Sequence, residues 1–319
     1  MLQDRQQIRR FPLIVGPTAG GKTALAVEVA LAFEALTGVR GEVVSADSMQ
    51  IYRGLDIGSA KPTPAERRGV PHHLIDIADP TDAFSVHQWL SMAEAAIDEI
   101  RSRSAAPVVA GGTHLYIKAL LDGLFEGPGA DEALRTQLAA IPAAERRAEL
   151  ERVDPEAAAR IHPNDERRTI RALEVYRLTG TPISEHQRQW DQGRQRDDRV
   201  LIGLEWPADA LSRRINARVR QMVEQGLIEE ARTLWEAGRL GPQAREALGY
   251  KQLIEHFEGR NGLGDAIEAI KIETRRFAKN QRTWLRRLKA VPGSVWIDAA
   301  ETPPEAWAQV VVSTCLRAD

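Results

Sequence analysis

The stretch LIVGPTAGGKTALAVEVA (residues 13–30) begins as an apolar run, turns through glycines and continues as an Ala/Leu/Val-rich segment typical of a helix. It contains the G-x-x-x-x-G-K-S/T pattern of a phosphate-binding loop, formed by Gly16, Gly21, Lys22 and Thr23. A strand before the loop and a helix after it are the context that this motif requires. The motif indicates that a polyphosphate group is bound, but it does not indicate which phosphate compound carries that group.

Backbone N–H groups of such a loop converge on phosphate oxygens, helped by the positive end of the following helix. Gly20 and Gly21 allow the backbone to approach the ligand closely. Lys22 supplies a positive charge, and Thr23 supplies a hydroxyl ligand for Mg²⁺, directly or through water. The predicted phosphate-binding residues are Gly16, Thr18, Ala19, Gly20, Gly21, Lys22 and Thr23.

Short apolar runs rich in β-branched residues alternate with helical patterns along most of the chain. The predicted strands are 11–16, 42–47, 73–78, 107–112, 200–206 and 294–299. Several of them are apolar without alternation, as expected of parallel strands that are covered on both faces. This pattern predicts an α/β protein with a parallel sheet of the P-loop NTPase type, flanked by helices, and an active site at the carboxyl ends of the strands.

The alternation of strands and helices stops in the middle of the chain. Residues 127–199 are rich in Ala, Arg, Glu and Leu and contain no convincing strand, so we interpret them as an all-α insertion domain. Residues 1–126 and 200–319 then form the catalytic core.

The amino-acid composition limits the possible partners and the cellular compartment of the protein. The 43 basic and 45 acidic side chains nearly balance, which gives no global sign of a nucleic-acid partner. The one cysteine, Cys315, excludes an intramolecular disulfide and a cysteine-cluster zinc site. We find neither a signal-peptide pattern nor a run approaching the ~20 apolar residues of a membrane span, and we expect a cytoplasmic protein.

Two predicted strands end beside residues that can do chemistry on a bound phosphate compound. Asp47 ends the second strand, where a carboxylate can accept a proton from a nucleophile; a turn or N-cap aspartate is the alternative. Thr113 follows PVVAGG and offers a hydroxyl, unless the glycines before it form only a tight turn. For Asp76, in HLIDIA, a structural role is favoured over a water-mediated Mg²⁺ site.

The segment DAIEAIKIETRRFAKNQRTWLRRLK (265–289) predicts a helix with a basic face. Eight basic side chains but only one acidic side chain lie between Lys271 and Lys289. At about 100° per residue, a cationic stripe and an apolar stripe lie roughly 150° apart. The cationic stripe consists of Lys271, Arg275, Lys279, Arg282 and Arg286, and the apolar stripe of Ile267, Ile270, Phe277, Trp284 and Leu288. We favour a surface that binds phosphates over a merely solvated face.

Two smaller basic clusters precede this helix along the chain. They consist of Arg167, Arg168 and Arg171 in the insertion, where Asn164 or Asp165 can cap the helix, and of Arg213, Arg214, Arg218 and Arg220 after the strand at 200–206. For either cluster alone, pairing with nearby glutamates is an equally good interpretation. All three basic regions together indicate a polyanionic partner larger than a nucleotide.

Motifs in a fixed order along nearly the whole chain make it resemble the tRNA dimethylallyltransferase (tRNA isopentenyltransferase) family in its compact bacterial form. They are GPTAGGKT, DSMQIYRGLDIGSAKP, GVPHHLIDI, GGTHLYIKALLDGL, HPNDERRTIRALEVY, ALGYKQ and the pattern RxxAKxQxTWLR in the basic helix. Ser59 stands where the family has threonine, and His114 fills a variable position. The cysteine-histidine zinc finger of eukaryotic members is absent from the sequence.

The resemblance implies a reaction. The loop would hold dimethylallyl diphosphate, and the dimethylallyl group would move to N6 of the adenosine immediately 3′ of the anticodon, in tRNAs that read codons beginning with U. Asp47 would be the general base, Arg218 (or else Arg220) would neutralise the leaving pyrophosphate together with the loop and Mg²⁺, and Thr113 would contact the substrate. The adenosine would be extruded into a tunnel.

The resemblance also implies a tRNA-binding surface, with the anticodon stem-loop as partner. Its predicted residues are Asp47, Ser48, Met49 and Gln50 at the tunnel entrance, Arg135, Arg167, Arg168 and Arg171 in the insertion, and Arg245, Tyr250, Lys279 and Arg282 in the core. The predicted enzyme is a monomer that contacts no membrane.

Two other functions use some of the same residues. A P-loop small-molecule kinase would explain the loop and Asp47 but would leave the basic helix without a role. An RNA-stimulated ATPase usually needs an apolar strand ending in two acidic residues, whereas Asp76 is followed by Ile77.

Overall fold

The computed structural model describes residues 8, 10–124, 127–191, 198–302 and 304–316. The chain divides into a larger unit, Met1–Ile117 with Arg196–Asp319, and a smaller unit, Lys118–Gln195. The smaller unit begins within helix α4 (His114–Asp122), whereas the predicted insertion begins at residue 127.

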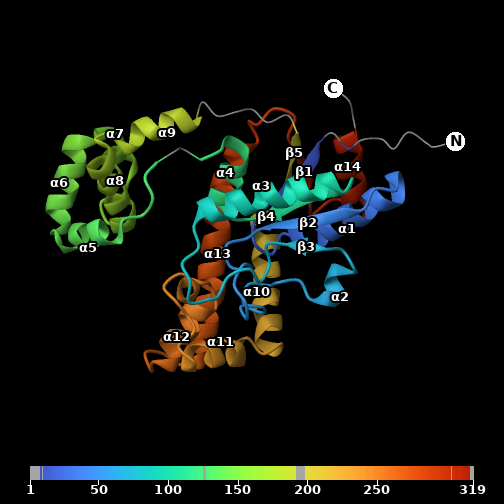
Figure 1. Cartoon of the computed structure of the whole chain (residues 1–319). Helices are drawn as coiled ribbons and strands as arrows, with labels where there is room; N and C mark the ends of the chain where they lie inside the picture. Colours follow the sequence, from blue (N-terminus) through green and yellow to red (C-terminus); the bar gives the residue numbers. More distant parts are fainter. Residues whose placement is uncertain (1–7, 9, 125–126, 192–197, 303, 317–319) are drawn as a thin grey trace. The chain divides into compact units, whose positions relative to one another are not determined.

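The larger unit is built on a six-stranded sheet with the order β3-β2-β4-β1-β5-β6, in which every neighbouring pair is parallel (Figure 1). The strands are β1 (Phe11–Val15), β2 (Gly41–Ala46), β3 (His72–His73), β4 (Ala106–Gly111), β5 (Arg199–Glu205) and β6 (Val295–Asp298). The prediction of a parallel sheet flanked by helices is confirmed.

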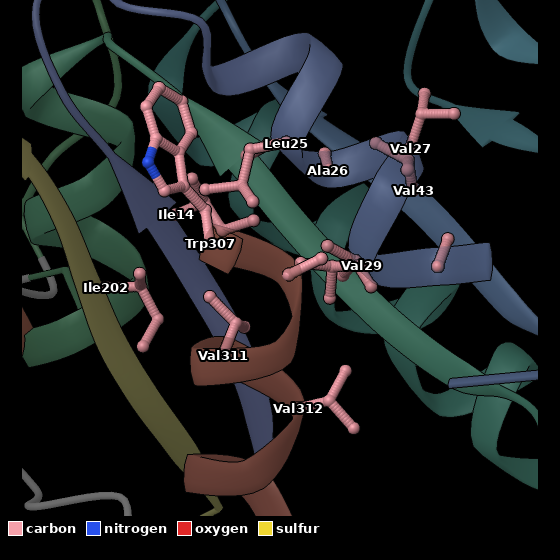
Figure 2. Close-up of a cluster of buried hydrophobic side chains, with 14 of the residues drawn as sticks. Ile14, Leu25, Ala26, Val27, Val29, Val43, Ile202, Trp307, Val311 and Val312 are labelled. Carbon is pink, nitrogen blue, oxygen red and sulfur yellow. The ribbon is translucent and has the colours of Figure 1, made fainter. Parts of the chain in front are cut away.

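One face of the sheet is covered by α1 (Lys22–Thr37) and α14 (Pro304–Leu316), whose side chains interdigitate with those of the strands (Figure 2). The cluster includes Trp307, and it also includes Cys315, where burial raises the pKa of the thiol to about 12. Alternate strand residues such as Val44 and Val109 are buried outside this cluster, and α3 (Val86–Ser102) packs against β2 and β4 there. Both faces are therefore apolar, which explains the continuous apolar runs.

A second core lies beyond the carboxyl ends of the strands. It is formed mainly by α10 (Ala208–Glu224), α11 (Leu227–Glu236), η1 (Ala244–Glu246), α12 (Tyr250–Phe257) and α13 (Leu263–Leu288). The short helix α2 (Pro64–Arg67) precedes β3.

The predicted strand at 73–78 is wrong for most of its length. Only His72 and His73 pair with β2, because Leu74 and Asp76 have left-handed backbones (φ 60° and 58°) that interrupt an extended chain. The Asp76 carboxylate lies 2.5 Å from the buried ammonium of Lys61, which agrees with its favoured structural role.

Among its described residues, the smaller unit contains five further helices around its own core. They are α5 (Glu132–Ala140), α6 (Ala143–Val153), α7 (Pro155–Arg160), α8 (Glu166–Thr179) and α9 (Ile183–Asp191). Carboxylates at the helix starts accept backbone N–H bonds: Asp131 caps α5, Asp154 caps α7, and Asp165 caps α8 as the sequence suggested.

A buried carboxylate joins two of these helices. The Glu174 side chain on α8 is fully buried and accepts hydrogen bonds from the Asp131 N–H (2.8 Å), Arg135 Nε (2.9 Å) and Arg171 Nη1 (2.6 Å). Burial alone would raise the pKa of Glu174, but the hydrogen bonds from Arg171, Asp131 and Arg135 outweigh it and hold the pKa below its ordinary value. Two arginines that we predicted to contact tRNA are thus bound inside their own unit.

We expect Glu174→Gln to lower the free energy of unfolding by about 3 kcal/mol, because it leaves two arginines without their shared counter-charge. Since the carboxylate pKa is depressed, its stabilisation is present at neutral pH and is lost as pH falls through the folded-state pKa, so the difference should shrink in acid. Urea unfolding at several pH values measures both effects. The control is Glu132→Gln, whose exposed carboxylate also pairs with Arg135 and should contribute below about 1 kcal/mol; equal losses would contradict the assignment.

Candidate active site

The phosphate loop turns sharply between β1 and α1. Ala19 and Gly21 have left-handed backbones (φ 58° and 91°), and the Gly20 N–H donates to the Pro17 carbonyl (3.1 Å). Helix α1 then begins at Lys22 with no acidic residue in its first turn, so its positive end is not neutralised by its own sequence. The loop therefore has the backbone conformation and the positive electrostatic potential that favour binding of an anion.

The outer side of the loop is held by two side chains from the β5–α10 region. Trp206 Nε1 donates to the Gly20 carbonyl (3.0 Å), and Arg214 Nε donates to the Ala19 carbonyl (2.9 Å) while its guanidinium stacks on Trp206 (4.3 Å to the ring centroid). Arg214, from one of the predicted basic clusters, therefore shapes the loop.

A cavity of about 450 Å³ lies where β1, β2 and β4 end, entirely within the larger unit. Part of its lining is polar and comprises Thr18, Lys22, Thr23, Asp47, Ser48, Gln50, Ser59, Thr113, Arg218, Glu246, Glu273, Thr274, Arg276, Asn280 and Gln281. Another part is apolar and comprises Ile215, Val219, Met222, Leu227, Ala247, Leu248, Ile270 and Phe277. The sheet thus brings together the predicted loop, base, hydroxyl and arginine in one concave site.

Two cations and one carboxylate set the electrostatics of the polar part. Burial lowers the pKa of the Lys22 ammonium to about 8; the Asp47 carboxylate opposes this effect and the Arg218 guanidinium adds to it. Burial is also the main cause of the lowered pKa of Arg218. Arg218 is half-buried, and within the described part of the chain its guanidinium makes no hydrogen bond or ion pair, so a bound anion would supply the direct partner that this partly desolvated charge needs.

Asp47 both closes a turn and faces the cavity. Its Oδ1 accepts hydrogen bonds from the N–H groups of Met49 (2.9 Å) and Gln50 (3.3 Å), as the turn interpretation of this residue expects. Its Oδ2 has no hydrogen bond to any residue that the structure describes. Thr113 Oγ1 accepts from the Ser48 N–H (3.0 Å) and fixes the same turn from β4.

Beside this turn, buried and half-buried polar groups stabilise the cavity wall. Gln50 accepts from the Ser45 hydroxyl and donates to the Ala60 carbonyl. Glu230 accepts from the Gly58 N–H (3.1 Å) and from the Tyr250 hydroxyl (2.5 Å). Tyr250, a predicted tRNA contact, is fully buried, so the structure places its ring inside the wall.

Helix α13 differs from its predicted faces. Its buried residues are Ala266, Ile270, Ala278, Gln281 and Leu285, whereas Phe277, predicted to be buried, is 43% exposed at the cavity. The reason is that α13 packs against both α10 and α12, so its buried face follows small residues and one glutamine as well as large apolar ones.

The cationic stripe of α13 divides into paired and unpaired members. Lys271 contacts Glu268 (3.1 Å), and Arg275 donates to Asn216 (2.6 Å). Lys279 is exposed and Arg282 half-buried, and neither has a partner among the residues that the structure describes.

The remaining predicted tRNA contacts lie elsewhere. Arg245 on η1 lies 3.8 Å from Glu258. In the smaller unit, Arg168 pairs with Asp165 (3.1 Å), and Arg167 is exposed with no partner in the described part of the chain.

The residues present fit a Mg²⁺ ion that arrives with a polyphosphate. Thr23 lines the cavity, as Asp47 does, and offers a hydroxyl. The described residues contain no group of three or more His, Cys, Asp or Glu side chains that could hold an ion by themselves. A hydroxyl completed by phosphate oxygens and water is the kind of ligand set that Mg²⁺ accepts.

Two kinds of site residue escaped the sequence analysis. The apolar lining from α10, such as Ile215, Val219 and Met222, has the helical spacing of an ordinary core face. Gln281 interrupts the buried face of α13, and a polar residue at such a position is the signal that could have revealed it.

A family model described as IPP transferase matches residues 50–288. The chain belongs to the IPP transferase family. It is therefore a transferase. It is 48% identical to the tRNA dimethylallyltransferase of Geobacillus thermodenitrificans (strain NG80-2), over 94% of this chain and 93% of that relative.

Solved structures agree with this membership. The crystal structure of the full-length tRNA isopentenylpyrophosphate transferase from Bacillus halodurans aligns with a TM-score of 0.70 at 40% identity and covers 97% of each chain. A eukaryotic dimethylallyltransferase, described in crystallographic snapshots of its action on tRNA, aligns with a TM-score of 0.77 at 28% identity, over 91% of this chain and 74% of that one. None of the described helices of this IPP transferase is long and apolar enough to cross a membrane.

We expect the affinity for inorganic pyrophosphate to fall as pH rises above about 8, by up to about tenfold per pH unit, because the Lys22 charge is complete below its pKa and is lost above it. Isothermal titration calorimetry between about pH 6.5 and 9.5 measures this dependence. In Lys22→Arg the cation does not titrate in this range, so the fall should disappear. An identical fall in this variant would show that another group is responsible.

Proposed function

We propose that this IPP transferase moves a dimethylallyl group from dimethylallyl diphosphate to N6 of the adenosine immediately 3′ of the anticodon, in tRNAs that read codons beginning with U. The products are the N6-dimethylallyl nucleoside in tRNA and pyrophosphate. The names of the relatives support transfer to tRNA, and the order of the sequence motifs supports the acceptor position. We propose that the enzyme acts as a cytoplasmic monomer.

The observation that carries this proposal is the composition of the cavity. A cationic, hydroxyl-bearing part suits a diphosphate, and the adjoining apolar part suits a hydrocarbon without polar atoms. The side chains of Ile215, Val219 and Met222 offer no hydrogen-bond partner to a ribose hydroxyl, whereas they suit the methyl groups of a prenyl chain. The apolar part therefore favours a prenyl diphosphate over the ATP of a kinase.

The transfer is a substitution at the allylic carbon, in which one bond forms and one bond breaks. The N6 atom of adenine forms a bond to C1 of the dimethylallyl group, and the C1–O bond to the diphosphate breaks with its electron pair on oxygen. The N6 proton goes to Oδ2 of Asp47, which has no partner in the described part of the chain. Lys22, Arg218 and the N–H groups at the start of α1 stabilise the charge that develops on the leaving group.

Thr113 and Thr23 support these steps in different ways. By accepting the Ser48 N–H, Thr113 holds the turn in which Asp47 lies and thus the direction of the base. Thr23 would hold Mg²⁺ together with the diphosphate oxygens, and the bound ion supplies further neutralisation of the leaving group.

The acceptor base must leave the anticodon stack to reach the cavity, as in other enzymes that modify bases. Met49 and Phe277 line the cavity from the Asp47 turn and from α13 respectively, and they offer apolar surface to an extruded base. Lys279 and Arg282 lie on the same helix as Phe277 but on a different face, outside the cavity lining, where unpaired cations can contact the phosphate backbone. In the smaller unit, Arg167 and Arg168 are exposed cations for the stem-loop.

The direct test is incubation with radiolabelled dimethylallyl diphosphate, Mg²⁺ and unmodified tRNA, followed by nucleoside analysis. We expect Asp47→Asn to lower kcat by about 10² to 10⁴ with tRNA affinity retained, because the amide oxygen still accepts the Met49 N–H but the side chain cannot take a proton. The control is Asp79→Asn, a turn aspartate bonded to Thr81, which should leave kcat unchanged. Transfer of phosphate from ATP to a small acceptor, with no prenylated nucleoside, would contradict the proposal and favour a kinase.

The role of α13 is tested by the salt dependence of tRNA binding. We expect the double variant Lys279→Ala/Arg282→Ala to bind tRNA more weakly and to reduce the slope of log K against log salt by about two, one for each lost phosphate contact. Lys271→Ala is the matched control, because Lys271 lies on the same stripe but contacts Glu268. Equal slopes for the double variant and the wild type would remove α13 from the RNA surface.

A further inference from the structure

Gln281 lies on the buried face of α13, is only 3% exposed, and lines the polar part of the cavity. Its Oε1 accepts a hydrogen bond from the Thr18 N–H (2.7 Å), and its Nε2 donates to the Gly112 carbonyl (3.0 Å). The partners fix the orientation of the amide, because a backbone N–H can only donate and a carbonyl oxygen can only accept. One side chain thus satisfies two backbone groups of the site.

These two bonds join three segments that are far apart in the sequence. Thr18 belongs to the phosphate loop, Gly112 follows β4, and Gln281 belongs to the helix that carries Lys279 and Arg282. The outer side of the loop is held by Trp206 and Arg214, whereas Gln281 is the side chain that holds Thr18 from the cavity side.

The packing around the amide leaves little freedom. A Cβ atom added to Gly112 would lie 2.8 Å from Gln281 Nε2 and 3.2 Å from Lys22 Nζ, so both the amide and the ammonium pack against the backbone at Gly112. A buried amide whose oxygen and nitrogen are both hydrogen-bonded holds the two bonded segments at a fixed distance from each other.

We propose that Gln281 is a positioning residue for the diphosphate: it holds the Thr18 segment of the loop at the distance from Gly112 and Lys22 that diphosphate binding requires. This inference rests on the proposed function for the identity of the diphosphate ester, but not for the anion site itself. Without the amide, the Thr18 N–H loses its acceptor and the loop loses its link to β4 and α13.

The test uses inorganic pyrophosphate with Mg²⁺ as the probe, measured by calorimetry on the full chain without tRNA. We expect Gln281→Met, which has similar length and makes neither bond, to bind pyrophosphate about tenfold more weakly. In steady-state assays KM for dimethylallyl diphosphate should rise by a similar factor, while KM for tRNA changes less than about twofold.

Gln281→Glu supplies a readout that a purely structural role would not move. The carboxylate still accepts the Thr18 N–H but cannot donate to Gly112, and it adds a negative charge beside the anion, so binding at pH 8 should be weaker than in Gln281→Met. A protonated carboxyl group can donate to the Gly112 carbonyl as the amide does. The affinity relative to wild type, compared at each pH, should therefore recover as pH falls.

The matched control is Gln243→Met. The Gln243 side chain also bridges two segments, accepting from the Tyr52 hydroxyl (2.6 Å) and the Phe84 N–H (2.7 Å), but it does not line the cavity. Its loss should lower the melting temperature without weakening pyrophosphate binding.

Each outcome has a defined meaning. Wild-type affinity in Gln281→Met, an equal loss in Gln243→Met, or a pH-independent deficit in Gln281→Glu would overturn the positioning role. If the wild type transfers no dimethylallyl group but Gln281→Met still loses pyrophosphate affinity, the proposed function fails and the positioning role stands.

Discussion

The site depends on how closely strands β2 and β4 approach each other at their carboxyl ends. A Cβ atom at Gly111 would lie 2.1 Å from the carbonyl oxygen of Ala46, so no side chain fits between β2 and β4 there. The parallel register can therefore continue to the last residue of both strands, and the Thr113 N–H still donates to Ala46 (3.3 Å). Asp47 and Thr113 leave the sheet side by side as a consequence, and Gly112, which follows β4, supplies the carbonyl to which Gln281 donates.

The basic side chains fall into two groups: those bonded within the protein and those available to bind an anion. Arg135 and Arg171 share the buried carboxylate of Glu174, and Arg275 is bonded to Asn216. Arg218, by contrast, is half-buried and lines the cavity, and its guanidinium makes no hydrogen bond or ion pair in the described part of the chain, although desolvating an unpaired charge costs free energy. A protein tolerates such an arrangement where a ligand completes it.

Sequence reasoning worked best where local pattern and topology act together. Parallel strands have their carboxyl ends on the same side of the sheet. This rule, with the loop motif and the predicted strand ends, was enough to place Asp47 and Thr113 together. It failed where distant segments decide the outcome. An apolar helix face looks the same whether it meets a cavity or a core, so the α10 lining was not foreseen, and Arg135 could not be assigned to Glu174 because the pairing requires the tertiary fold. The break after His73 has no local signal, since it depends on left-handed residues held by contacts such as that between Asp76 and Lys61.

The depressed pKa of Lys22 has a thermodynamic consequence for the arrival of substrate. A bound polyanion favours the ammonium over the amine, so occupation of the loop must shift this equilibrium back toward the charged form. In mildly alkaline solution the two events are linked: the chain takes up a proton from the medium as the anion enters and releases it when pyrophosphate departs. The heat of association then contains the ionisation enthalpy of the buffer, and each catalytic cycle carries a small reversible exchange of hydrogen ions between the loop and its surroundings.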